Sequence, residues 1–530
     1  MSVDAISLEV FRSLFSSIAD EMGETLRRAS FSPNIKERLD FSCAVFDDQA
    51  RMVAQAAHIP VHLGSMPASV ETAVRAFEEI HEGDVIVLND PWGGGTHLPD
   101  ITMVSPVFAG SRLEYFVASR AHHADVGGMT PGSLPLSTEI YQEGIIIPPV
   151  KLMYGGWLSE GLLALITANS RNPEERIGDL EAQLAAHRVG MDRMRDLLVR
   201  QGLERVREHA DALMAYSQRM TEAVIDSIPD GDYRFEDALE GDGQREYRIP
   251  ICVTLRVQGR RMSVDFEGSA PQVRGNLNAV SAIARSATWY CIRLLAGEDV
   301  PVNHGCFQPV AVTTPAHSLL EPDFPAGVAV GNTETTQRVA DTVLGALAQA
   351  LPGRMPAASC GTMSNVLCGG LLEGRQFVYY ETIGGGHGGG PAGPGISGRH
   401  VHMTNTLNTP VESLEQEFPF RVLEYGLREG SGGAGRHPGG EGIRRRYQFL
   451  CPTTLTINSE RRIYPPWGLA GGEAGACGSN RLLREGQERD LGGKYVGELG
   501  AGDVVIVETP GGGGWGAPEL QTAETGTGAK

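Results

Sequence analysis

Lysine is scarce in this 530-residue chain, which has only Lys36, Lys151, Lys494 and Lys530 among its 45 basic residues. A P-loop needs a lysine beside the nucleotide phosphates, a Schiff base needs a lysine amine, and no GxxxxGK[ST] sequence occurs. The sequence therefore offers no ordinary nucleotide-binding loop and little scope for lysine chemistry.

Long apolar runs and paired cysteine motifs are also missing. No run reaches the ~18 apolar residues of a membrane span, and Asp4 and Glu9 lie where a signal peptide would be basic and then apolar. The eight cysteines are scattered without a CxxC pair, which favours reduced, buried thiols over a zinc ribbon or a disulfide framework. We therefore expect a cytoplasmic protein.

The charge balance is acidic, with 65 Asp and Glu against 45 Lys and Arg and a formal net charge of -20. Such a balance repels phosphate backbones and anionic membrane surfaces. We expect neither a nucleic acid nor a membrane as a partner.

Glycine, in contrast, is abundant, at 68 of 530 residues, nearly twice the usual ~7%. Apolar residues recur with helical spacing over 6–29 and 173–227, whereas 40–149 and 232–330 contain short strand-like runs. At ~150 residues per domain, the length predicts three or four domains. The fold class predicted is α+β: a multidomain mixed α/β architecture with Gly-rich loops and a largely β C-terminal part.

The same patterns predict four regions along the chain. They are an N-terminal α+β domain with a metal site and long helices at 173–227 (1–230), a central α+β domain with helices at 282–295 and 337–351 (231–405), a Gly-rich, mostly β region (406–516) and a disordered tail (517–530).

Histidines and carboxylates are concentrated between residues 89 and 128. His97 and Asp100 are three positions apart in a Gly- and Pro-rich loop, and the strand-like runs that follow form a predicted pair that returns His122 beside them. Two imidazoles and a carboxylate without thiolate suit Mn²⁺, Fe²⁺ or Zn²⁺ with positions left open. Asp40, just before an apolar strand, is a candidate fourth ligand. The alternative is an ordinary hydrogen-bonded His–Asp pair, since HxxD is common by chance.

Other motifs carry weaker signals. The segments 430–435 and 511–516 satisfy GxGxxG, but neither links a strand to a helix, which argues against a dinucleotide site. The loop Gly384–Gly390 either wraps an anion or allows close backbone packing. Glu139 and Glu143 are either solvated acids or supports of the His loops.

Three further histidines, His387, His400 and His402, form either a second metal site or loop contacts to backbone carbonyls.

Several motifs in order make the chain resemble the hydantoinase B/oxoprolinase family, the B subunit of ATP-dependent hydantoinases. The resemblance covers almost the whole chain. The motifs are Glu37–Ser42, Asn89–Asp100, His122–Gly128, Ser137–Gly144, Ile147–Leu152, Asp265–Gly268, His402–Thr406, Gly430–Gly440 and Pro510–Gly516. One departure is His304, between Asn303 and Gly305, where a less unusual residue is expected.

The resemblance implies a division of labour between two subunits. An A subunit of the actin-like ATPase superfamily phosphorylates a carbonyl oxygen, and the B subunit completes ring opening at a divalent metal; related complexes carboxylate ketones instead. The metal ligands of such carboxylases fall on His97, Asp100 and His122, and an additional aspartate of lactamase-type members falls on Asp40.

These expectations combine into one predicted function. The chain is predicted to be the metal-dependent catalytic subunit of an ATP-driven amidohydrolase, part of a hetero-oligomer, that opens a hydantoin, 5-oxoproline or lactam. Asp40 completes the metal shell or takes a proton from water, and His123 and Asp125 orient ligands or shuttle protons. A ketone carboxylase subunit and a scaffold with a structural metal remain as alternatives.

Overall fold

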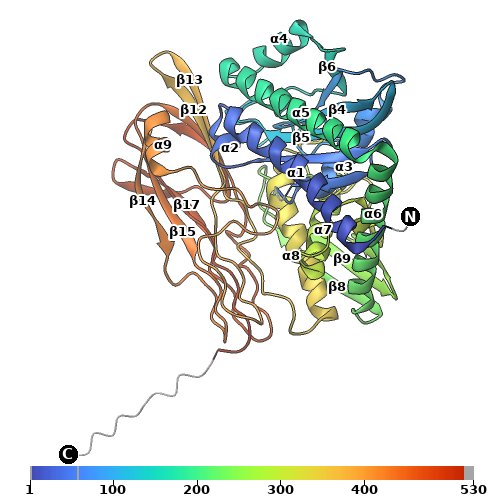
Figure 1. Cartoon of the computed structure of the whole chain (residues 1–530). Coiled ribbons are helices and arrows are strands. Elements are labelled where there is room, and N and C mark those ends of the chain that lie inside the picture. The colour runs from blue at the N-terminus through green and yellow to red at the C-terminus, as the bar shows by residue number, and fades with distance from the viewer. Residues whose placement is uncertain (1–2, 57–58, 519–530) are drawn as a thin grey trace, which may run out of the picture.

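The computed structural model describes residues 3–56 and 59–518. Figure 1 shows the C-terminal strands, orange to red, beside an N-terminal and central part built of helices and sheets. The described residues form four sheets. The predicted multidomain mixed α/β architecture with a largely β C-terminal part is thereby confirmed.

A seven-stranded sheet in the order β2-β1-β5-β4-β3-β6-β7 occupies the N-terminal part. Its strands are β1 (Phe41–Asp47), β2 (Met52–Gln55), β3 (Val85–Leu88), β4 (Asp100–Ala109), β5 (Arg112–His122), β6 (Val150–Tyr154) and β7 (Trp157–Leu158). The predicted pairing is confirmed, because β4 and β5 are antiparallel with Asp100 opposite His122.

Helices cover both faces of this sheet. They are α1 (Ala5–Ala29), α2 (Pro33–Lys36), α3 (His62–Arg75), α4 (Glu160–Ala168), α5 (Pro173–Gln201) and α6 (Leu203–Asp226). Helices α1, α5 and α6 pack with Cys43 and Val45 on one face, and α3 packs with Ala44 and Phe46 on the other. Because successive strand residues point to opposite faces, every residue of β1 is buried.

The predicted helices at 6–29 and 173–227 correspond to α1, α5 and α6, and Gly202 separates the last two. Helix α3 was not predicted, because its segment lies within a stretch dominated by short apolar runs.

A four-stranded sheet in the order β11-β10-β9-β8 forms the central part. Its strands are β8 (Gly231–Leu239), β9 (Ile249–Gln258), β10 (Arg261–Asp265) and β11 (Val310–Thr313), and its helices are α7 (Ser281–Ala296) and α8 (Thr336–Ala350). A π-helical turn, Gly331–Thr335, leads directly into α8. Such turns occur often at functional sites, and this one reaches the metal-site candidates.

Two further sheets, β13-β12-β16-β19 and β14-β15-β20-β17-β18, make up the C-terminal part. The elements are β12 (Asn365–Leu372), β13 (Arg375–Glu381), α9 (Val411–Glu417), β14 (Phe420–Arg428), β15 (Gly442–Phe449), β16 (Thr453–Asn458), β17 (Ser479–Arg484), β18 (Gln487–Asp490), β19 (Lys494–Leu499) and β20 (Val504–Glu508). Strands β12 and β13 precede residue 406 yet pair within this part. The domain boundaries stay a prediction, and the proposed tail lies outside the described residues from 519 on.

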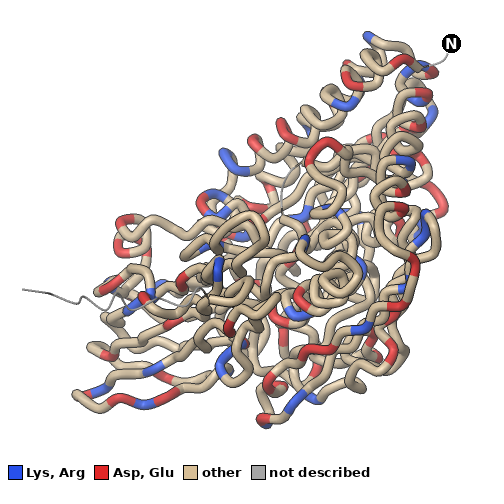
Figure 2. The backbone as a smooth tube through the Cα atoms, turned by 90° about the horizontal axis from the view of Figure 1, so that it is seen from below, with Lys and Arg blue, Asp and Glu red and all other residues tan. Residues whose placement is uncertain are grey.

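No helix of the described chain is long and apolar enough to cross a membrane. Figure 2 shows acidic and basic residues interspersed along the backbone.

The glycine-rich loops pack backbone against backbone. Segment 384–390 packs against both 430–440 and 510–516: the N–H of Gly386 donates to the carbonyl of Pro510 at 3.0 Å, and the N–H of Gly440 donates to the carbonyl of His387 at 2.8 Å. A Cβ on Gly512 would lie 2.1 Å from the carbonyl oxygen of His387, and one on Gly386 would lie 2.0 Å from that of Gly440. Close packing therefore accounts for the glycines of this loop except Gly390, where a Cβ would make an ordinary contact with Pro356 at 3.8 Å.

We expect Gly512→Ala to lower the thermal stability of the protein strongly. Overpacking typically costs about 1–3 kcal/mol, and here the added methyl group meets a backbone carbonyl rather than a flexible side chain. The measurement is the melting temperature followed by circular dichroism. Gly393→Ala is the control, because a Cβ there meets nothing within 4 Å; equal melting of both variants would contradict the packing argument.

Candidate metal centre

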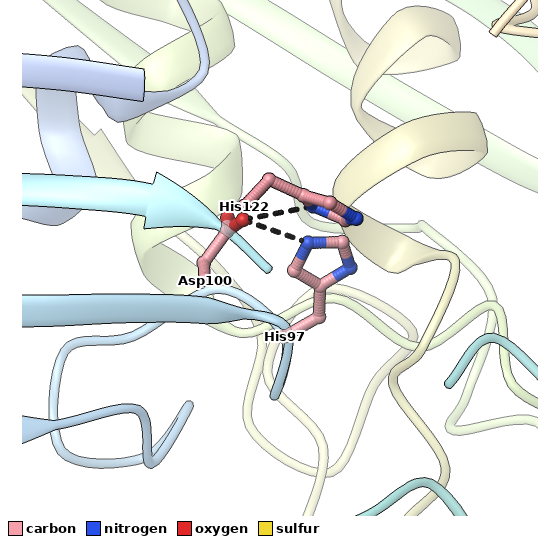
Figure 3. A group of neighbouring side chains, drawn as sticks. All are labelled: His97, Asp100 and His122. Carbon is pink, nitrogen blue, oxygen red and sulfur yellow. Dashed lines mark hydrogen bonds and ion pairs between the residues drawn. The ribbon is translucent and has the colours of Figure 1, made fainter. Parts of the chain in front are cut away.

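Three buried side chains meet where β4 and β5 begin and end. His97 lies in the loop before β4, Asp100 is the first residue of β4, and His122 is the last of β5. One oxygen of Asp100 lies 3.1 Å from His97 Nε2 and 3.1 Å from His122 Nδ1 (Figure 3). One ligand atom from each residue lies within 4.8 Å of the others, and this is the one such group found among the described residues.

A set of neighbours orients these groups. His97 Nδ1 donates to the carbonyl of Ala329 at 2.9 Å, which directs Nε2 toward Asp100. The other oxygen of Asp100 accepts from the hydroxyl of Thr96 at 2.5 Å and from Asn332 Nδ2 at 3.2 Å. His62 Nε2 lies 3.5 Å from the same oxygen. Such contacts hold ligands in one orientation.

His62 and Asn332 were missed by the sequence analysis. His62 begins α3, and Asn332 lies in the π-helical turn, more than 200 positions from Asp100 in the sequence. No local motif marks either residue, so only their position in the fold reveals them.

Asp40 reaches the group from the segment before β1. Its carbonyl accepts the backbone N–H of His122 at 3.0 Å, and its carboxylate lies 3.8 Å from the buried guanidinium of Arg38. Leu39, between them, has φ +60°, a conformation that is costly for a bulky residue and concentrates at functional sites. The backbone is thus strained where it directs Arg38 and Asp40 to the site.

The pKa values of these buried side chains depend on their burial and on the charges of their neighbours. Burial alone would raise the pKa of Asp100, but the charge of His97 and hydrogen bonds from His122 and His62 hold that pKa well below its usual range. Burial opposes protonation of His97, yet the Asp100 carboxylate raises its pKa. Burial lowers the pKa of His122 and of His62. Asp100 is therefore a carboxylate among imidazoles, which is the ionised form that a metal requires.

The donor set fits a divalent metal. The 3.1 Å between His97 Nε2 and Asp100 Oδ1 matches two ligands that each lie ~2.1 Å from a common ion. His122 Nε2 and Asn332 Oδ1 are buried without a hydrogen-bond partner, a condition that normally costs free energy. Nitrogen and oxygen donors without thiolate accept Mn²⁺, Zn²⁺ or Fe²⁺.

Two of the three candidate ligands, His97 and His122, line a small cavity of about 20 Å³. That volume holds about one water-sized group. The other lining residues are Asp40, Ile59, Val61, His62, Asn332, Thr333, Met363, Tyr380, Thr382, Met403, Thr404 and Thr406.

His123 and Asp125, predicted as catalytic, have other partners. His123 Nε2 lies 2.9 Å from the amide oxygen of Gln183, and burial together with Arg176 holds its pKa well below the usual range. Asp125 pairs with Arg171 at 2.8 Å and accepts backbone N–H groups of its own loop. Asp125 thus stabilises its own loop, and His123 contacts α5. Their catalytic roles stay a prediction.

The remaining candidate histidines lie apart from this group. His402 lies 3.3 Å from Asp341, His400 Nε2 lies 3.4 Å from Asn408, and His387 Nδ1 donates to the carbonyl of Gly388. His304 Nε2 lies 2.6 Å from the amide of Gln308. Of the three histidines considered for a second metal site, only His387 makes the predicted contact to a backbone carbonyl within the described structure. His400 and His402 contact side chains instead.

Glu143 binds the backbone segment whose carbonyl accepts a hydrogen bond from His97. Its Oε1 accepts from Ser137 Oγ at 2.6 Å and from the backbone N–H of Val328 at 2.8 Å, next to the Ala329 carbonyl that holds His97. Its Oε2 is buried without a partner. Burial raises the pKa of Glu143 to about 7. Glu139, in contrast, is exposed.

We expect Glu143→Gln to flatten the pH dependence of stability. The folded pKa lies above the unfolded value, so this group stabilises the fold fully below about pH 4.5, and that contribution is lost as the pH rises through about 7. Because of this one group, the free energy of unfolding changes by at most about 1.4 kcal/mol per pH unit. The measurement compares melting temperatures from pH 4.5 to 8, with Glu139→Gln as the exposed control. Parallel curves for wild type and Glu143→Gln would contradict the assignment.

Comparison with known proteins decides the family. The sequence model of the family described as hydantoinase B/oxoprolinase matches residues 4–518. The chain belongs to this family. The resemblance in its motifs is therefore confirmed.

Relatives of this family member differ in length. An uncharacterized protein of Methanocaldococcus jannaschii is 43% identical, with 97% of this chain and 91% of that protein aligned. The 5-oxoprolinase 1 of Arabidopsis thaliana is 40% identical, with 97% of this chain but 42% of that protein aligned. The chain thus spans less than half the length of the plant relative.

Two solved structures share the fold of this family member. The ATP-dependent caprolactamase from Pseudomonas jessenii superposes with a TM-score of 0.92 at 30% identity, covering 98% of this chain and 93% of the other. An acetone carboxylase structure gives a TM-score of 0.90 at 17% identity, covering 97% and 76%. The second likeness, at this identity, concerns the fold alone.

Proposed function

We propose that this chain is the metal-dependent catalytic half of an ATP-driven amidohydrolase that opens a cyclic amide such as a hydantoin, 5-oxoproline or a lactam. The buried group of His97, Asp100 and His122 carries the proposal. The names of the similar proteins support the general class, since they are a 5-oxoprolinase and an ATP-dependent caprolactamase.

The chemistry explains why ATP and a metal are used together. An unstrained amide is a poor electrophile, and phosphorylation of its oxygen converts that oxygen into a leaving group. His97, Asp100 and His122 would hold Mn²⁺, Zn²⁺ or Fe²⁺, which supplies Lewis acidity at neutral pH. Asp40, on the wall of the same cavity, completes the shell or accepts a proton from the attacking water.

The ATP step belongs to a partner in this proposal. The plant 5-oxoprolinase is more than twice as long as its matched part, and this chain has no P-loop. The partner is an A subunit of the actin-like ATPase type, and the two form a hetero-oligomer.

A ketone carboxylase subunit is the second candidate, because the metal ligands of such carboxylases also fall on His97, Asp100 and His122 in this sequence. The test incubates the purified complex with ATP and either a panel of hydantoins, 5-oxoproline and lactams or a ketone with labelled bicarbonate. Ring opening of a cyclic amide supports the proposal. Label incorporated into the ketone, without ring opening, would replace it with the carboxylase.

We expect Asp40→Asn to retain near-normal metal content but to lose turnover by on the order of 10²-fold. The amide keeps the size and one oxygen donor and removes the charge and basicity. Elemental analysis and the ring-opening assay measure the two effects, with the exposed Asp48→Asn as control. Loss of metal would make Asp40 an ordinary ligand, and unchanged turnover would remove it from the site.

A further inference from the structure

Three threonines line the same cavity as His97 and His122. Thr382 follows β13, and Thr404 and Thr406 lie in the loop before α9. Their exposed fractions are 2%, 5% and 4%. The C-terminal part of the chain therefore contributes a polar wall to a cavity whose metal-site candidates come from the N-terminal part.

The hydroxyls form a hydrogen-bonded row that begins at Arg38. Arg38 Nη2 donates to Thr382 Oγ1 at 2.9 Å, Thr382 and Thr406 hydroxyls lie 3.0 Å apart, and Thr406 and Thr404 hydroxyls lie 3.3 Å apart. The Arg38 side chain is fully buried, and its guanidinium stacks on the Tyr380 ring at 4.7 Å. The cation at the start of the row is thus held in place.

Counting hydrogens shows that the row has one donor to spare. Three hydroxyls carry three hydrogens, and the two contacts between them use two, whichever way each contact points. The guanidinium accepts nothing, so it cannot take the third hydrogen. No hydrogen bond among the described residues uses it either, and all three threonines line the cavity.

The cation favours one direction along the row. A hydroxyl that accepts from a guanidinium becomes a better donor, and successive hydrogen bonds polarise one another. The favoured direction runs from Arg38 through Thr382 and Thr406 to Thr404. The spare hydrogen then belongs to Thr404.

We propose that this row binds an anionic oxygen of the substrate, with Thr404 as the donor that touches it. The inference deepens the proposed function and rests on it for the identity of the substrate. The cavity admits about one water-sized group, which suits a single oxygen atom. A donor placed where negative charge develops lowers the barrier of acyl transfer chemistry, so phosphoryl, carbonyl and tetrahedral oxygens all belong to the class recognised.

Fluoride is the probe, because it is an anion of about the size of one oxygen. Its ¹⁹F relaxation is measured with the full chain, with and without Mn²⁺. Thr404→Val, which keeps the shape and removes the hydroxyl, is expected to weaken fluoride binding about tenfold, the value of one hydrogen bond to a charged group. Thr404→Ser is expected to bind like wild type.

Two further measurements separate this role from a structural one. Thr221→Val is the matched control, since that buried hydroxyl has no partner and lies in α6. In the complex, Thr404→Val is expected to lower kcat by on the order of 10²-fold with little change in KM. Thr382→Val, which detaches the row from Arg38, is expected to give a smaller loss.

The outcomes distinguish the two proposals. A Thr404→Val protein with normal metal content and wild-type fluoride binding would overturn the threonine assignment and leave the proposed function intact. A wild-type protein that takes up no metal would overturn the metal-dependent function, and the fluoride titration without Mn²⁺ would still test the threonine row. Absence of fluoride binding to wild type in both conditions would also overturn the inference.

Discussion

His97→Ala and His122→Ala are each expected to lose stoichiometric metal and all measurable ring opening while remaining folded. Removal of one of two imidazoles leaves an oxygen-rich group that binds first-row ions more weakly. It also leaves the buried Asp100 carboxylate without one of its two imidazole contacts at 3.1 Å. The separate apolar clusters of the central and C-terminal parts do not include these residues, so the fold should persist.

Elemental analysis of the purified variants measures the metal, and far-ultraviolet circular dichroism reports the fold. His317→Ala is the matched control, because its imidazole is three-quarters exposed and pairs with Asp323 at the surface. Full metal occupancy in both cluster variants would place the ion elsewhere and remove the observation on which the proposed function depends.

The isolated chain is expected neither to hydrolyse ATP nor to open a ring, and activity is expected only with the ATPase partner. The chain has no P-loop. Its most glycine-dense loop, Gly384–Gly390, is occupied by close backbone packing rather than presented for phosphate binding. The nucleotide site must therefore come from another chain in the proposed scheme.

The measurement expresses the chain alone, loads it with Mn²⁺, Zn²⁺ or Fe²⁺, and assays phosphate release and ring opening with ATP. The co-purified complex serves as the positive control. ATP-dependent turnover by the isolated chain would contradict the division of labour. Ring opening that needs no ATP would indicate an ordinary metal-dependent hydrolase.

The sequence by itself determined the local structure and part of the site. Helical apolar spacing located α1, α5 and α6, and strand-like runs around a turn predicted the β4–β5 pair. That pairing brings His122 opposite Asp100, so three candidate ligands were recoverable from a single stretch of chain. Local periodicity and short-range pairing suffice there because the residues are close in sequence.

Only the tertiary structure decided which distant residues complete the site. Asn332, His62 and the threonine row reach the cavity from the π-helical turn, from α3 and from the loop before α9. It also assigned Asp125 to an ion pair with Arg171 and the glycines to backbone packing. The physical reason is that the energies which position these groups come from burial and from contacts between separate parts of the chain. A local sequence pattern does not predict such contacts, because the residues that make them are far apart in the sequence.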